Sequence, residues 1–199
     1  MDRDAWDDRY RDREWLWTAE ANRSVVQETV GLNPGRALDL AAGEGRNAVW
    51  LAKQGWDVTA VDFSGVALGR ASDLAAREGV TITTVEADLR DYVPAVGAFD
   101  LVLLSYLHLP PVFFREVLAR AAGALAPGGT LVVVGHDLSN IEEGYGGPQS
   151  PEVLYTPDSL VGDLGDLEIV KAEKVDRPYE ADEGTFTAID ALVVATRPQ

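Results

Sequence analysis

Four residues between Arg36 and Asp62 have the types and spacing needed to bind a ligand. Asp39 lies within one apolar run, Gly43 and Gly45 follow that run, and Asp62 ends the next one. Glycine lets a backbone turn sharply and lets a ligand come close, because it carries no Cβ. An acid at the end of the second run can accept two hydrogen bonds from a ribose diol. The pattern predicts a site for a cofactor that contains a nucleoside.

Two histidines, the only ones in the chain, could move protons near such a site. His108 and His136 each follow an apolar run. An imidazole titrates near pH 6.5, so either side chain could accept a proton at neutral pH, or could simply be a hydrogen-bonded wall residue. Tyr10 and Tyr106 are expected to shape a pocket, because a phenol with a pKa near 10 is a poor proton acceptor.

Alternating strands and helices must position these residues. The sequence predicts short apolar strands at 37–40, 57–61, 81–86, 100–104 and 130–135. Ser64 caps one intervening helix, which stops at Gly79, and Pro111 starts another, which stops before Pro127. Such alternation requires right-handed crossovers and a parallel sheet covered on both faces. Ligands of these sheets bind at the carboxyl ends of the strands.

The end of the chain has a different pattern. A helix is predicted at 155–164, followed by strands at 167–175 and 187–196 that are joined by a loop at 176–184. That connection has no helical crossover, so the two strands should pair antiparallel. We therefore predict an α/β fold: a single-domain, Rossmann-like doubly wound sheet of seven strands, mostly parallel with an antiparallel C-terminal edge strand. The Gly- and Pro-rich stretch 137–155 is expected to be a loop beside the ligand crevice.

One domain is expected for a chain of 199 residues. Within it, residues 1–30 would form an N-terminal helical lid or flank and residues 31–199 the Rossmann-like core. Trp6, Tyr10 and Trp17 fall on one face of a predicted helix. The sequence leaves two alternatives open, because that face could pack on the flank of the sheet or cover a ligand pocket.

The composition excludes several classes of protein. Without cysteine, the chain has no disulfide and no thiolate metal site. No apolar run reaches the roughly 18 residues of a membrane span, and the charged first residues are unlike a signal peptide, so we expect a cytoplasmic protein. A net charge of −16 would repel a nucleic-acid backbone, which favours a small-molecule partner over DNA or RNA. The oligomeric state is not indicated.

Two cofactors are compatible with the glycine turn. The stretch Gly43 to Ala48 matches G-x-G-x-x-G/A, so an NAD-dependent oxidoreductase is one alternative. Against it, Asp39 and Glu44 would repel a pyrophosphate, and the chain has little room for substrate-binding structure. S-adenosylmethionine presents an α-ammonium and a sulfonium but no phosphate, which suits an acid at Asp39.

These residues give the chain a resemblance to the class I S-adenosylmethionine-dependent methyltransferases, whose first motif is [DE]-x-G-x-G-x-G. Here the motif is D-L-A-A-G-E-G, with Ala41 in place of the first glycine. The stretches VTAVDFS, VEADLRD, FDLVLLS and LAPGGTLVVV also resemble motifs of this family and occur in the same order. Within the family, WDDRY, GEGRN and PQSPEVLYTPDSL are similar to bacterial tellurite-resistance and thiopurine-type methyltransferases, which act on small molecules.

The resemblance implies S-adenosylmethionine as the cofactor and assigns roles around it. Asp62 would hold the ribose hydroxyls and Asp88 the adenine amino group, while Arg46 could reach the methionine carboxylate. Phe63 and Leu89 would flank the adenine. The expected cofactor set is Asp39, Ala41, Gly43, Gly45, Arg46, Asp62, Phe63, Asp88, Leu89 and Ser105. The expected acceptor pocket is Trp6, Tyr10, Trp17, Tyr106 and His108, and the catalytic candidates are His108 and His136.

We therefore expect methyl transfer from S-adenosylmethionine to a small molecule by in-line displacement. A protein that binds the cofactor without turnover is a further alternative. The stretch Leu109 to Val112 lacks the polar and aromatic ends of the [DNS]-P-P-[YFW] motif of amino-group methyltransferases. Ser105 stands where metal-dependent catechol-type enzymes need an acid, so no metal is expected.

Overall fold

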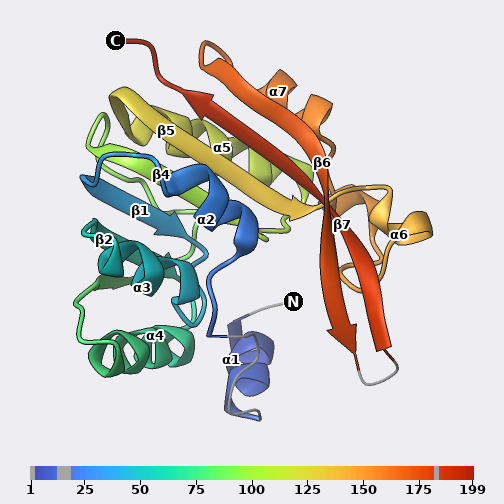
Figure 1. Ribbon diagram of the computed structural model, residues 1–199, viewed down its shortest axis with the longest axis horizontal. Helices are drawn as coiled ribbons and strands as arrows, with labels where there is room; N and C mark the ends of the chain where they lie inside the picture. Colours follow the sequence, from blue (N-terminus) through green and yellow to red (C-terminus); the bar gives the residue numbers. More distant parts are fainter. Residues whose placement is uncertain (1–2, 13–18, 182–183) are drawn as a thin grey trace.

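The computed structural model describes residues 3–12, 19–181 and 184–199. Its centre is a seven-stranded sheet with the order β3-β2-β1-β4-β5-β7-β6 (Figure 1). The strands are β1 Arg36–Leu40, β2 Asp57–Asp62, β3 Thr83–Glu86, β4 Phe99–Ser105, β5 Leu125–His136, β6 Glu168–Ala181 and β7 Gly184–Thr196. The helices are α1 Arg3–Arg11, α2 Arg23–Thr29, α3 Arg46–Lys53, α4 Gly65–Arg77, α5 Pro111–Ala124, α6 Asn140–Glu143, η1 Pro151–Val153 and α7 Pro157–Asp163. This is the predicted Rossmann-like α/β fold.

The direction of the strands identifies where a ligand should bind. Strands β1 to β5 are parallel to one another, and β7 is antiparallel to both β5 and β6. The antiparallel strand is therefore the last one of the chain, and β6 pairs along its outer side. Strand β1 pairs with β2 on one side and with β4 on the other, so the strand order reverses there. Doubly wound sheets bind their ligands at this switch point.

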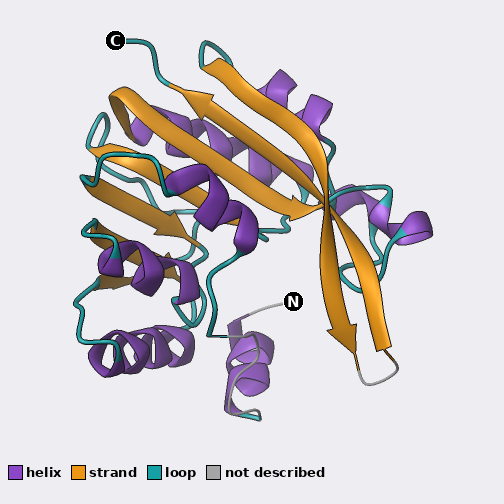
Figure 2. Ribbon diagram, in the orientation of Figure 1, coloured by secondary structure: helices purple, strands orange, loops and turns teal. Residues whose placement is uncertain are grey.

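Helices cover both faces of the sheet, because the central strands are apolar on both faces. On one face, α2 and α3 contribute Val25 and Leu51 to the core, and on the other face α5 and α7 contribute Leu118 and Leu160. Figure 2 shows these helices on the two sides of the strands. Among the described residues, no helix has both the length and the apolar composition needed to cross a membrane.

Local signals start the helices where the sequence predicted. The Ser64 hydroxyl accepts the Ala67 N–H at 3.0 Å and begins α4. The Thr156 hydroxyl accepts the Ser159 N–H at 3.1 Å, and Pro157 takes the first position of α7. Both residues satisfy an amide that the first helical turn cannot pair.

Two segments differ from the prediction. The expected loop at 176–184 is mostly strand, because β6 continues to Ala181 and β7 begins at Gly184. This part of the hairpin extends past the end of β5, so it lacks the apolar alternation of a strand that faces the core (Figure 1). The expected loop at 137–155 contains α6 and the 3₁₀ turn η1.

Candidate active site

The turn after β1 brings the backbone close to the ends of β1 and β2. Gly43 and Gly45 have φ of +55° and +78°, in the left-handed region that glycine adopts without strain. A Cβ on Gly45 would lie 2.5 Å from the Cβ of Ala71, so α3 and α4 could not pack this closely around another residue. The predicted role of the glycines in a tight turn is therefore seen in the structure.

Ala41, the alanine at the first glycine position of the motif, is also left-handed, with φ of +61°. A non-glycine residue in that region carries strain of about 1–2 kcal/mol. Strain of this kind tends to persist where the surrounding structure holds a functional conformation. The backbone therefore keeps the glycine conformation although the side chain has changed.

Asp39 is the least satisfied charged group of the site. Its side chain is fully buried, and neither carboxylate oxygen makes a hydrogen bond of good geometry with the described residues, although the charge of Arg46 and the Ala48 N–H act to lower its pKa. Burial first, and the charge of Asp62 second, raise the pKa of Asp39 to about 7. An ionised carboxylate in such surroundings is unfavourable unless a cation or a hydrogen-bond donor joins it. The geometry therefore fits a ligand that brings a positive, donating group to the end of β1.

Asp62 lies beside it at the end of β2 and is also buried. Its Oδ2 accepts the Gly43 N–H at 2.9 Å, and its Oδ1 accepts the Ser64 N–H at 2.9 Å. Burial raises the pKa of this carboxyl. Each carboxylate oxygen can accept a second hydrogen bond, so the side chain is fixed in place and still able to receive a diol.

The residues expected around an adenine differ in burial and in their hydrogen bonds. Asp88 is bonded to Arg90, with 2.5 Å between Oδ2 and the nearest guanidinium nitrogen, and this hydrogen bond lowers the pKa of Asp88. An adenine amino group would have to share this carboxylate with Arg90. Leu89 is buried in the main core, and Phe63 is half-buried after β2.

The turn also carries one acidic residue, Glu44, and one basic residue, Arg46, and they have different neighbours. Glu44 is buried and paired with Arg70 at 2.8 Å, so its charge is balanced inside the protein. Arg46 begins α3, and its guanidinium carbon lies 6.0 Å from the centre of the Tyr106 ring. Burial lowers the pKa of Arg46. Arg46 is thus the guanidinium of the turn that faces the strand ends.

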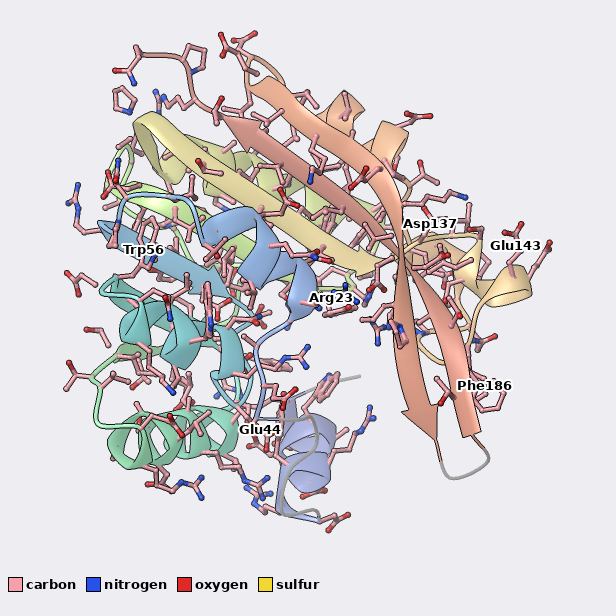
Figure 3. The ribbon with its side chains drawn as sticks, in the orientation of Figure 1. Arg23, Glu44, Trp56, Asp137, Glu143 and Phe186 are labelled. Carbon is pink, nitrogen blue, oxygen red and sulfur yellow. The ribbon has the colours of Figure 1, made fainter. Side chains whose placement is uncertain are left out.

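Helix α1 lies against this turn, away from the faces of the sheet. Tyr10 is buried, and its hydroxyl would be 3.1 Å from a Cβ on Gly43. Asp7 accepts a hydrogen bond from the Ser64 hydroxyl, and Trp6 stacks on Tyr10 with 5.8 Å between ring centres. Figure 3 labels Glu44 close to this helix. Helix α1 thus lies beside the turn after β1 and the start of α4, and a role as a cover over an acceptor pocket stays a prediction. The third aromatic residue, Trp17, lies outside the described residues.

A row of aromatic rings follows the ends of β4 and β5. The His108 ring is 5.5 Å from that of His136 and 5.4 Å from that of Tyr155. The Tyr106 ring lies 5.1 Å from that of His136, and Phe114 stacks on Tyr155 at 5.0 Å. The structure therefore brings the two catalytic candidates together with the predicted pocket residue Tyr106.

The residues that hold this row in place were not predicted from the sequence. Asp190 on β7 is buried and accepts hydrogen bonds from the Tyr106 hydroxyl at 2.6 Å and from Arg177 Nε at 2.7 Å. Asn22 donates to the same tyrosine hydroxyl at 3.1 Å. Burial and the charge of Asp190 raise the pKa of Tyr106, so this phenol remains protonated. One signal was available, because Asp190 is an acid inside an otherwise apolar strand.

The two histidines differ in their hydrogen bonds. His108 Nδ1 lies 3.0 Å from the carbonyl oxygen of Val153, whereas His136 Nδ1 is 3.5 Å from Asp190 Oδ1. Burial lowers the pKa of both rings, that of His136 to about 4. Both are therefore neutral at neutral pH. Figure 3 labels Asp137, next to His136, where β5 reaches the β6–β7 hairpin.

Ser105 ends β4, and its buried hydroxyl has no partner among the described residues. Among residues 3–12, 19–181 and 184–199, no group of three histidine, aspartate or glutamate side chains could hold a metal ion.

Known proteins share this sequence pattern and this fold. A family profile described as "Methyltransferase domain" matches residues 37–129. The ribosomal RNA small subunit methyltransferase C of Alcanivorax borkumensis is 32% identical over 58% of this chain and 37% of its own length. The chain spans 37–54% of the length of the first curated relatives that it matches.

Two solved structures superpose on nearly the whole chain. TehB from Haemophilus influenzae has a TM-score of 0.75 and 18% identity over 96% of this chain and 67% of its own. The N-methyltransferase NodS from Bradyrhizobium japonicum, in complex with S-adenosyl-L-homocysteine, has a TM-score of 0.75 and 18% identity over 99% of this chain and 98% of its own. At this level of identity the likeness concerns the fold.

Proposed function

We propose that this chain, which belongs to the class I S-adenosylmethionine-dependent methyltransferases, transfers the methyl group of S-adenosylmethionine to a small molecule. The proposal combines the sequence family with the chemistry of the strand ends. When bound, the cofactor supplies a methyl group on a positively charged sulfur.

The buried carboxylate of Asp39, without a partner among the described residues, is the observation that carries the proposal. The α-ammonium of S-adenosylmethionine would give it both a positive charge and hydrogen bonds. The pyrophosphate of NAD would instead bring negative charge toward Asp39 and Asp62, which already raise the cost of ionisation at this end of the sheet. The site therefore favours the phosphate-free cofactor.

Other residues would hold the rest of the cofactor. Asp62 would receive the ribose hydroxyls, Asp88 the adenine amino group and Arg46 the methionine carboxylate. The left-handed backbone at Ala41, Gly43 and Gly45 would let the methionine part approach the main chain. Phe63, Leu89 and Ser105 would line the remaining sides.

Methyl transfer depends more on the positioning of the two reactants and on the exclusion of water than on strong acid–base chemistry, because the sulfonium is already activated. Helix α1 would exclude water from the turn, with Tyr10 already buried there. His108 is the better proton acceptor of the two histidines. Its Nε2 is buried and has no partner among the described residues, whereas the His136 ring has a pKa of about 4.

The proposed acceptor is a small molecule, and the proposed location is the cytoplasm. A relative in the comparison acts, by its name, on ribosomal RNA. In this chain the net charge of −16 opposes nucleic-acid binding, and the candidate acceptor side is lined with aromatic rings.

Calorimetry with S-adenosylhomocysteine and with NAD tests the proposal. We expect S-adenosylhomocysteine to bind and NAD to give no heat of binding. The Asp39→Asn variant should lose about tenfold or more in affinity, because the charged partner of the ammonium is removed. Asp57→Asn, exposed at the other end of β2, is the matched control and should bind like the wild type. Binding of NAD alone would refute the proposal.

A further inference from the structure

We infer that the methyl acceptor is an uncharged molecule whose nucleophilic atom still carries a proton, such as a thiol, a phenol or an enol, and that His108 Nε2 receives this proton. This inference rests on the proposed function and adds the chemical class of the acceptor. It follows from the protonation state of His108 and from the charges of the groups around it.

The hydrogen bond of His108 fixes which of its nitrogens is free. Its Nδ1 lies 3.0 Å from the Val153 carbonyl oxygen. A carbonyl oxygen can only accept, so Nδ1 must carry the hydrogen, and in a neutral imidazole Nε2 is then a bare acceptor. Nε2 is buried without a partner among the described residues. A ligand that satisfies this atom has to donate a hydrogen bond to it.

The neighbouring rings are neutral. Burial lowers the pKa of His136 to about 4, so its ring carries no charge at neutral pH. Tyr155 is buried on the other side of His108, and its hydroxyl has no partner among the described residues. Burial raises the pKa of this hydroxyl, so it stays protonated. Neither His136 nor Tyr155 therefore supplies a charge that could balance an anion beside His108.

The charged groups on β6 and β7 already balance each other. Arg177 Nε is 2.7 Å from Asp190 Oδ2, and the same carboxylate lies 3.5 Å from His136 Nδ1. An anionic acceptor would lose its hydration beside neutral rings and beside a guanidinium, Arg177, whose charge is already paired with Asp190, which is unfavourable. The guanidinium of Arg46, beside the Tyr106 ring, belongs to the cofactor side in the proposed function.

The reaction then balances without another reactant. A lone pair of the acceptor atom forms the new bond to the methyl carbon while the carbon–sulfur bond breaks, and the electrons of that bond remain on sulfur. The proton of the acceptor moves to His108 Nε2. The resulting imidazolium releases it to water after the product leaves, because burial lowers the pKa of this ring.

Nitrogen-15 NMR tests the inference directly, since the chain has two histidines. The spectra are recorded on protein labelled at histidine and loaded with S-adenosylhomocysteine, whose binding is first measured by calorimetry. We expect His108 to be the tautomer with hydrogen on Nδ1. Adding 4-methoxyphenol should shift the Nε2 resonance, and adding selenite should leave it in place. His108→Asn assigns the resonance and retains a donor toward the Val153 carbonyl.

Transfer of a labelled methyl group to 2-mercaptoethanol and 4-methoxyphenol, compared with selenite and tellurite, gives the second readout. His108→Asn should lower the rate on the neutral acceptors by about 10²–10⁴-fold and leave S-adenosylhomocysteine affinity unchanged. Glu142→Gln, exposed on α6, is the control. Methylation of the oxyanions alone, or hydrogen on Nε2 of His108, would overturn the inference. If either of these results is obtained with protein that binds S-adenosylhomocysteine, the inference fails and the proposed function stands. If S-adenosylhomocysteine does not bind, the proposed methyltransferase function is refuted.

Discussion

At the scale of single residues, the charge of Asp39 decides what the site can hold. Its carboxyl is buried, and its pKa of about 7 means that the ligand-free protein holds it partly protonated at neutral pH. A cationic ligand needs the ionised form. Ligand binding and proton release from Asp39 should therefore be coupled.

This coupling predicts the pH dependence of cofactor affinity. The affinity for S-adenosylhomocysteine should rise as the pH increases from 5.5 to about 7 and then level off, because the proton on Asp39 has to leave before the ammonium binds. Calorimetry in buffers of different ionisation enthalpy should show proton release below pH 7. Asp39→Asn should remove both effects, and an unchanged pH profile in this variant would exclude Asp39 as the source.

The same pKa has a defined sign for stability. The carboxyl titrates at 3.8 as its ordinary value and at about 7 in the folded protein, so between these values the folded state binds more protons. Without ligand, the contribution of Asp39 to stability should therefore fall as the pH rises through this window. Relative to the wild type, Asp39→Asn should gain stability over the same range, as measured by urea unfolding.

A further prediction concerns Ala41, which has a left-handed backbone. Ala41→Gly should stabilise the protein by about 1 kcal/mol, since relief of strain exceeds the added entropy of the unfolded chain. Ala42→Gly is the matched control. It should destabilise by about 0.5–1 kcal/mol, because Ala42 has no positive φ to relieve. Urea unfolding measures both, and a loss of stability in Ala41→Gly would show that the residue is unstrained.

At the scale of elements, α1 is joined to the cofactor turn through side chains. Asp7 accepts a hydrogen bond from Ser64, and Tyr10 is buried against Gly43. Asp7→Ala should speed the dissociation of S-adenosylhomocysteine severalfold, because α1 would no longer be bonded to the start of α4. Stopped-flow displacement measures this rate. Asp8→Ala, exposed on the same helix, should dissociate like the wild type, and equal rates in both variants would exclude α1 as a cover.

The proposed cofactor residues could be brought together from the sequence because they belong to local motifs. Asp39, Gly43 and Asp62 lie at or next to the ends of adjacent strands, and all three belong to one short stretch of the sequence. The acceptor side could not be predicted in the same way. Asp190 and Arg177 reach Tyr106 only because β7 adds to β5 and β6 adds to β7, which is a pairing between distant parts of the chain.

At the scale of the whole molecule, the sheet explains why these groups meet. The strand order reverses at β1, so the carboxyl ends of β1, β2 and β4 lie side by side at the switch point of the sheet. The long β6–β7 hairpin extends beyond the other strands and contributes the acid and the guanidinium of the acceptor side (Figure 1). Proposed donor and acceptor sites thus share one edge of the sheet.

A crystal structure with S-adenosylhomocysteine tests the central claim most directly. We expect its α-ammonium within hydrogen-bond distance of an Asp39 oxygen and its ribose hydroxyls on Asp62, with the adenine toward Asp88. A ligand bound elsewhere, or bound at the strand ends with Asp39 still unpaired, would contradict the account.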